Sequence, residues 1–150
     1  VGRWESVIFG MIDVIDQQIS KMLKLLEDTG QAENTIVIFM TDNGPNTWRY
    51  NAGLRGRKGH LYDGGIRVPC FVRWPGKLEE RTLEEPLSHI DILPTLVDWC
   101  QLNGAETLEL DGRSFASLAK GPPSEWPLRK LISFSVGSKE RIQTTGTVHY

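Results

Sequence analysis

The 150-residue sequence lacks a long apolar run, a large excess of one charge, and more than a few cysteines or histidines. No stretch approaches the roughly 18 consecutive apolar residues that a membrane-spanning helix needs, so we expect no membrane span. The net charge of −2 gives no reason to expect nucleic-acid binding, which calls for concentrated Lys and Arg. With 39% hydrophobic and 24% charged residues, the composition is typical of a globular domain with one core.

Cysteine and histidine are too scattered for a disulfide framework or a zinc site. The two cysteines, Cys70 and Cys100, do not have the spacing from the three histidines that zinc ligands show. We predict that both are buried, unpaired thiols. No Gly-x-Gly-x-x-Gly segment joins a strand to a helix, which argues against a dinucleotide-binding unit.

Apolar periodicity predicts a helix followed by a buried strand in the first 40 residues. Apolar residues recur at intervals of three and four, which places them on one helical face. The members of this face are Ile8, Ile12, Ile15, Ile19, Met22 or Leu23, and Leu26. Gly30 suits the left-handed position that ends a helix. The β-rich run Ile36–Met40 does not alternate, so we expect a strand covered on both faces, and hence half of an α/β unit.

The later segments predict further elements without a linker between them. Residues 43–65 are rich in glycine and have no regular period, which indicates a long irregular loop. We expect a strand at 66–74, with Pro69 at an edge or bulge, and a final strand at 130–136. Ser88 or Asp91 can cap a helix that follows. A short helix is expected to stop at Gly121.

The end of the first predicted strand carries polar residues of a particular kind. Thr41, Asp42 and Asn43 follow the strand directly, and ligands of open α/β sheets collect beyond the carboxyl ends of strands. A carboxylate next to an amide oxygen offers the hard oxygen ligands that calcium or magnesium prefers. Calcium takes about six to eight oxygens, so further ligands must come from elsewhere. The alternative is a strand-ending Asx turn with Gly44 at positive φ.

Positive charge is concentrated between residues 55 and 73. This stretch of 19 residues holds one acid, Asp63, and five cations: Arg55, Arg57, Lys58, Arg67 and Arg73. Its glycines let the backbone approach a ligand, and Lys58 can place a point charge on an anionic oxygen. Arg55 and Arg57 either bind beside Lys58 or face solvent, and His60 either donates to the anion, acts as an acid, or is simply exposed. We expect Asp63 to brace the loop by pairing with an arginine.

Four segments, in this order, resemble the later part of the catalytic domain of type I sulfatases, in the alkaline-phosphatase-like superfamily. They are TIVIFMTDNG, LRGRKGHLYDGGIRVP, SHIDILPTLVDW and LDGRSF. The preceding FGMIDVIDQQISKMLKLLEDTG also resembles the family segment before the metal-binding strand. The resemblance implies an α/β fold, a mixed sheet flanked by helices, of which this chain holds only the later portion. It also implies a calcium ion that holds the sulfate group of an organic ester while a hydrated formylglycine attacks sulfur.

The resemblance assigns roles to particular residues. Asp42 and Asn43 match metal ligands, and Lys58 matches the lysine that contacts the sulfate oxygens, so Lys58 is the expected catalytic residue of this stretch. We add His60 and Arg55 as candidate substrate-binding residues. Asp63 stands where family members more often have Glu.

The nucleophile motif of the family is missing from these residues. Neither Cys-x-Pro-x-Arg nor Ser-x-Pro-x-Arg occurs, and no Asp-Asp pair can supply the early metal ligands. These features belong near the amino terminus of family members. We therefore expect residues 1–150 to be a partial catalytic domain that is inactive alone and needs the remainder of that domain as its partner. Family members usually work in lysosomes, the periplasm or outside the cell.

Two other functions stay open. A phosphatase or phosphodiesterase of the same superfamily would call for histidines beside aspartates as transition-metal ligands, and neither His60 nor His89 has that pattern. A non-catalytic module would use the basic loop alone to capture sulfated glycans or other anions. For the sulfatase and for the non-catalytic module, the expected ligand is a sulfated small molecule or glycan. Trp48 and Tyr50 either stack on a sugar or pack within the loop.

Overall fold

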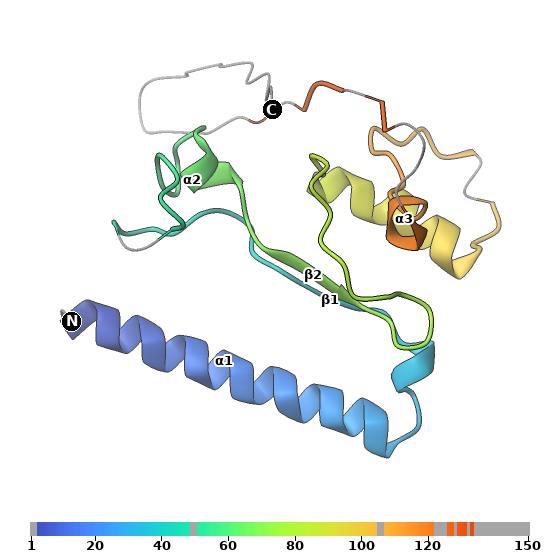
Figure 1. The fold of residues 1–150 in the computed structure, drawn as a ribbon, viewed down its shortest axis with the longest axis horizontal. Helices are drawn as coiled ribbons and strands as arrows, with labels where there is room; N and C mark the ends of the chain where they lie inside the picture. The colour runs from blue at the N-terminus through green and yellow to red at the C-terminus, as the bar shows by residue number, and fades with distance from the viewer. Residues whose placement is uncertain are drawn as a thin grey trace. The chain divides into compact units, whose positions relative to one another are not determined.

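The computed structural model describes residues 3–48, 51–104 and 107–121, together with 126, 127, 129–131 and 133. Its elements, in chain order, are α1 (Arg3–Asp28), η1 (Ala32–Asn34), β1 (Val37–Met40), α2 (Asp63–Ile66), β2 (Cys70–Arg73), η2 (His89–Asp91), α3 (Ile92–Cys100) and η4 (Leu118–Lys120) (Figure 1). None of the described helices is long and apolar enough to cross a membrane. The strand expected at 130–136 lies mostly outside the described residues.

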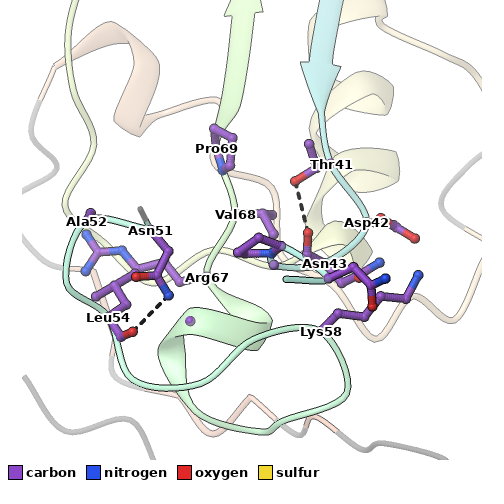
Figure 2. A pocket seen from close by; sticks show the side chains of 14 residues that line it. Thr41, Asp42, Asn43, Asn51, Ala52, Leu54, Lys58, Arg67, Val68 and Pro69 are labelled. Atoms are coloured by element: carbon purple, nitrogen blue, oxygen red, sulfur yellow. Dashed lines mark hydrogen bonds between the residues drawn. The ribbon is translucent and has the colours of Figure 1, made fainter. Parts of the chain in front are cut away.

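The chain divides into two compact units, and it crosses between them within β1, within β2 and again between Leu78 and Glu79. The first unit holds α1, η1, the start of β1 as far as Ile38, and residues Val72–Leu78. The second unit holds Phe39–Phe71 and the described residues from Glu79 onward. β1 and β2 pair as a two-stranded sheet, and their arrows point in opposite directions in Figure 2. The part of the sheet that the structure describes is therefore a single antiparallel pair.

The first unit confirms the predicted helix and its stop. α1 spans 26 residues, and Gly30 follows it with φ of 69°, a value that an L side chain adopts only with strain. The Arg73 guanidinium lies 3.1 Å from a Glu27 carboxylate oxygen, and the Trp74 indole donates to the Glu33 carbonyl at 3.0 Å. These contacts fix the end of α1 and η1 against the end of β2 and the residue after it.

The apolar face of α1 is only partly buried. Ile8, Ile19, Leu23 and Leu26 are half-buried, whereas others on the predicted face, such as Ile12 at 53%, remain exposed. The periodicity thus predicted the helix correctly, but the described residues do not cover the whole face.

The core of the second unit is built on Asp91, whose side chain is fully buried. Its carboxylate accepts hydrogen bonds from the Ser88 backbone N–H at 2.7 Å and the Arg113 backbone N–H at 2.8 Å, and it forms an ion pair with Arg129. Ser88 and Asp91 take the N-cap positions of η2 and α3, but the Asp91 side chain makes no cap hydrogen bond to α3 and instead pairs with the Ser88 backbone in a capping box. The Thr95 hydroxyl donates to the Asp91 carbonyl at 2.6 Å and accepts from the Phe115 N–H at 3.0 Å.

Three expectations about local structure were wrong. The loop at 43–65 contains the start of a helical turn, α2, which periodicity cannot reveal because Gly64 and Gly65 carry no side chains. β2 is shorter than the predicted strand at 66–74, since α2 takes Ile66. Cys70 and Cys100 are unpaired as expected, but both are exposed. Burial of part of the Cys70 side chain still raises the pKa of its thiol, which disfavours the reactive thiolate.

β1 also differs from the expectation of a strand covered on both faces. Its residues are half-buried except for Phe39, which is 38% exposed. Phe39 stacks on Phe71, with ring centroids 6.3 Å apart, and Phe71 is 65% exposed. The two rings stack on each other, and both keep part of their surface exposed.

We predict that Asp91→Asn destabilises the protein by about 3–5 kcal/mol, because it leaves the Arg129 charge buried without its partner. Burial alone raises the pKa of Asp91, but the hydrogen bonds from Arg129, Arg113 and Ser88 and the Arg129 charge outweigh it, so this pKa lies below its usual range. A lowered carboxyl pKa contributes stability above about pH 4, and that stability is lost as pH falls through the lowered pKa. Urea unfolding between pH 3 and 7 should therefore show a weaker acid dependence in the variant.

The matched control is Asp98→Asn, which changes an exposed carboxylate in α3, the helix that follows Asp91. It should leave both the midpoint and its pH dependence close to wild type. Equal unfolding free energies for wild type and Asp91→Asn at pH 7 would contradict the central role assigned to this carboxylate.

Candidate functional site

An open depression of about 720 Å³ lies beyond the end of β1 (Figure 2). All of its lining residues come from one stretch of the second unit between β1 and β2. They are Thr41, Asp42, Asn43, Gly44, Pro45, Asn46, Asn51, Ala52, Leu54, Lys58, Gly64, Arg67, Val68 and Pro69. The depression therefore forms where the strand ends and the glycine-rich loop folds back on it.

The end of β1 is held by backbone contacts with the loop. The Gly44 N–H donates to the Gly65 carbonyl at 2.9 Å, and the Lys58 N–H donates to the Pro45 carbonyl at 2.9 Å. A Cβ on Gly44 would overlap the Gly64 carbonyl group. Gly44 is not among the glycines with positive φ. Close packing against α2, rather than the positive φ expected for an Asx turn, is thus what requires glycine at 44.

The glycines of α2 make this approach possible. The Gly64 N–H donates to the Arg55 carbonyl at 2.7 Å, and both Gly64 and Gly65 are buried. An added Cβ would overlap carbonyl oxygens at either position, of Gly56 for Gly64 and of His60 for Gly65. Backbone packs directly on backbone here, which brings Lys58 to the depression that Asp42 and Asn43 line.

The polar groups of the depression keep their capacity to bind a ligand. Asp42 and Lys58 are exposed and Asn43 is half-buried. Among the residues that the structure describes, the Asp42 carboxylate accepts no hydrogen bond and the Lys58 ammonium group forms no ion pair. Figure 2 shows these three residues along one side of the depression, with Asn51, Ala52 and Leu54 along the other.

Some of the predicted site residues lie elsewhere. Arg55 and His60 do not line the depression. The Arg55 guanidinium lies 3.7 Å from the centroid of the Tyr62 ring, and His60 lies beside Trp48, with ring centroids 6.1 Å apart. Asp63 forms no ion pair with a described arginine and instead begins α2, so the bracing role expected for it was wrong.

Three polar lining residues had been given no site role from the sequence. Arg67 adds a second exposed cation to the depression, and its place in the basic stretch was the only signal for it. No sequence motif around Asn46 predicts that it lines the depression. Asn51 has a structural part, since its side-chain amide donates to the Leu54 carbonyl at 2.9 Å and the Gly56 carbonyl at 3.1 Å.

The donor set suits part of a calcium site. Asp42 and Asn43 supply hard oxygens, and the described residues hold no group of three or more His, Cys, Asp or Glu side chains able to bind a metal. Two oxygens are far fewer than the six to eight or so that calcium takes. The residues present therefore fit a shared site, in which other segments would complete the coordination.

Comparison with known proteins identifies the family. Residues 6–102 match the sulfatase family model. Arylsulfatase A of Homo sapiens is 37% identical over 114 residues, which cover 71% of this chain and 22% of that protein. N-acetylglucosamine-6-sulfatase of Bos taurus is 31% identical over 133 residues, which cover 88% of this chain and 22% of that protein. The chain spans about a fifth of the length of these relatives.

A solved structure agrees with the sequence matches. A sulfatase from work on the metabolism of multiple glycosaminoglycans by Bacteroides thetaiotaomicron superposes with a TM-score of 0.67 and 28% identity, covering 89% of this chain and 28% of that one. The likeness shows a partial α/β unit of the alkaline-phosphatase-like fold. Together with the family match, it establishes that the chain belongs to the sulfatase family.

We predict that Gly44→Ala destabilises the protein by about 1–3 kcal/mol, because the new Cβ displaces the strand end from α2. The control is Gly10→Ala in α1, where an added Cβ meets nothing within 4 Å. Alanine at that helical position should stabilise by about 0.5–1 kcal/mol. Urea unfolding checks both variants, and equal behaviour of the two would contradict the close-packing argument.

Proposed function

We propose that residues 1–150 are the later part of a sulfatase catalytic domain that hydrolyses an organic sulfate ester. The observation that carries this proposal is the convergence of Asp42, Asn43 and Lys58 on one depression at the end of β1. The family match supports it, because the relatives that share this stretch are sulfatases. The mechanism then follows from what each of these side chains offers to a sulfate group.

Asp42 and Asn43 would hold a calcium ion through a carboxylate and an amide oxygen. Bound calcium supplies positive charge that offsets the charge on the sulfuryl oxygens. The two ligands come from adjacent residues at a strand end, and the backbone there is fixed by the Gly44 contact with Gly65. The backbone that carries both ligands is therefore fixed by the fold.

Lys58 would donate N–H hydrogen bonds to the sulfate oxygens. Its ammonium is a compact point charge on a flexible stem, and the Lys58 backbone N–H is fixed to the Pro45 carbonyl. Such preorganised donors aimed at developing charge are usually the largest single contribution to acyl- and phosphoryl-type transfers, and the same reasoning applies to sulfuryl transfer. Arg67 lines the same depression and adds a second cation for the anionic group.

The remaining parts of the reaction would come from residues outside 1–150. We propose that they provide the formylglycine nucleophile and the other calcium ligands, and that they pack on the exposed apolar side chains of the strands and α1. Phe39 and Phe71 on the strands, and Phe9 and Met11 on α1, expose between 38% and 65% of their surface. The stacked Phe39 and Phe71 rings form an exposed apolar pair within the second unit, and exposed apolar side chains of this size commonly mark a surface that another part of the protein covers.

We predict that Asp42→Ala combined with Asn43→Ala abolishes calcium binding by the longer protein that carries this sequence, because both oxygen ligands are lost. Isothermal titration calorimetry with calcium chloride measures this directly. The matched control is Asp98→Ala with Asn103→Ala, which removes the same two side-chain types from exposed positions outside the depression. Unchanged calcium affinity in the Asp42 and Asn43 variant would mean that these residues form only a turn.

We predict that Lys58→Gln lowers kcat for a small aryl sulfate ester by about 100- to 1000-fold, since one preorganised donor to the sulfuryl group is lost. Lys77→Gln, an exposed lysine outside the depression, is the control and should keep wild-type kcat. The same assays with an aryl phosphate ester separate a sulfatase from a phosphatase. Calcium and sulfate-ester binding without any turnover in the longer protein would favour a non-catalytic anion-binding module instead.

A further inference from the structure

A large aromatic side chain remains exposed beside the depression, with the side chains of Arg57 and His60 next to it. Trp48 is 71% exposed. The Arg57 guanidinium carbon lies 5.2 Å from the centroid of the Trp48 ring, and the His60 ring lies 6.1 Å from it at a tilt of 54°. We call Trp48, Arg57 and His60 the tryptophan cluster. An exposed tryptophan with fixed neighbours presents a flat binding surface at low entropic cost.

The tryptophan cluster is connected directly to the depression. The Arg57 side chain donates from Nη1 to the Asn46 carbonyl at 2.9 Å, and Asn46 lines the depression. Lys58 follows Arg57 in the chain and lines the depression itself. The tryptophan cluster and the Lys58 cation are therefore neighbours along the same loop.

Tight loop packing keeps the tryptophan cluster in this arrangement. The His60 N–H donates to the Arg57 carbonyl at 2.9 Å. Gly56 is buried with φ of 91°, and a Cβ there would lie 3.2 Å from the His60 Cβ and 3.1 Å from the Tyr62 Cβ. Arg55 packs on the Tyr62 ring at 3.7 Å. The loop thus closes on itself around Gly56 and leaves Trp48 facing outward as an exposed ring.

The charges around the tryptophan cluster select the class of ligand. The loop contributes the cations Arg55, Arg57 and Lys58, with the single acid Asp63 in the same stretch. An aromatic face packs on the C–H face of a sugar ring, because the negative face of the ring system attracts the positively polarised C–H bonds. Cations beside it attract negatively charged substituents. A purely apolar group would instead remove water from the Arg57 guanidinium without replacing its hydrogen bonds.

We propose that the tryptophan cluster is a substrate-selecting subsite that binds an anionic sugar ring of a sulfated glycan while the sulfate to be removed lies at Lys58. Trp48 contacts the sugar face, and Arg57 contacts a sulfate or carboxylate on the same or the next ring. This inference rests on the proposed function, because it names the substrate class of the same site. It makes residue 48 a determinant of substrate choice.

The test compares two substrates and one binding probe in the longer protein that carries this sequence. Trp48→Ala should lower the ratio of kcat/KM for a sulfated oligosaccharide to kcat/KM for a small aryl sulfate ester by about 3- to 10-fold. Trp48→Phe, which keeps an aromatic face, should restore most of this ratio. Leu108→Ala, an exposed apolar residue outside the loop, is the control and should leave the ratio at its wild-type value.

A direct binding measurement tests the subsite without requiring turnover. A heparin hexasaccharide should bind wild type more tightly than Trp48→Ala or Arg57→Gln, with a salt dependence that weakens in Arg57→Gln, and neutral maltohexaose should not bind. An unchanged substrate ratio together with unchanged heparin affinity in Trp48→Ala overturns the subsite while leaving the sulfatase proposal intact. Heparin binding that needs Trp48, in a protein that hydrolyses no sulfate ester, supports the subsite and overturns the proposed reaction.

Discussion

The candidate site depends on the packing of backbone against backbone where Gly44 meets the two glycines of α2. The hydrogen bond from the Gly44 N–H to the Gly65 carbonyl joins the residue after Asn43 to a segment about twenty positions further along the chain. Since a Cβ on any of these glycines would overlap a carbonyl group, the contact exists only because all three side chains are absent. The positions of Asp42 and Lys58 are consequences of this one contact, and neither side chain has to be held by a partner of its own.

Close packing of a glycine against a backbone carbonyl also occurs near Asp91 in the second unit. A Cβ on Gly112 would overlap the Ile90 carbonyl, one residue before the buried Asp91. There the close approach brings the Arg113 N–H to within 2.8 Å of the Asp91 carboxylate. Glycine thus serves close packing in both places, once to shape a ligand site and once to complete a buried network. In neither place does its freedom to adopt positive φ decide the structure.

The sequence predicted those elements whose physics is local. Apolar spacing and the glycine that follows predicted α1. A β-rich run that ends in polar residues predicted β1. α2 could not be found in this way, because Asp63-Gly64-Gly65 has low helix propensity and no periodic face. The long-range contact of Gly44 with Gly65 holds that turn, and a linear pattern does not contain such contacts.

The candidate site was predictable to the same extent. The types and order of Asp42, Asn43 and Lys58 pointed to an anion and a divalent cation, because their chemistry can be read from single residues. The assignments of Arg55 and His60 to the substrate depended on where a glycine-rich loop turns, which the sequence leaves open. The structure places both outside the depression, on aromatic rings. Arg67 was visible only as a charge until the loop brought it to the depression.

The two acids at the centres of these arrangements show how structure separates a folding role from a binding role. Asp91 is fully buried, and backbone donors and Arg129 satisfy its carboxylate. Its charge therefore stabilises the packing of η2, α3 and the residues near 113. Asp42 is exposed, lies beside cations, and accepts no hydrogen bond from a described residue. The calcium site proposed above rests on this difference, because an exposed carboxylate and a neighbouring amide on a fixed strand end keep their oxygens available for a cation.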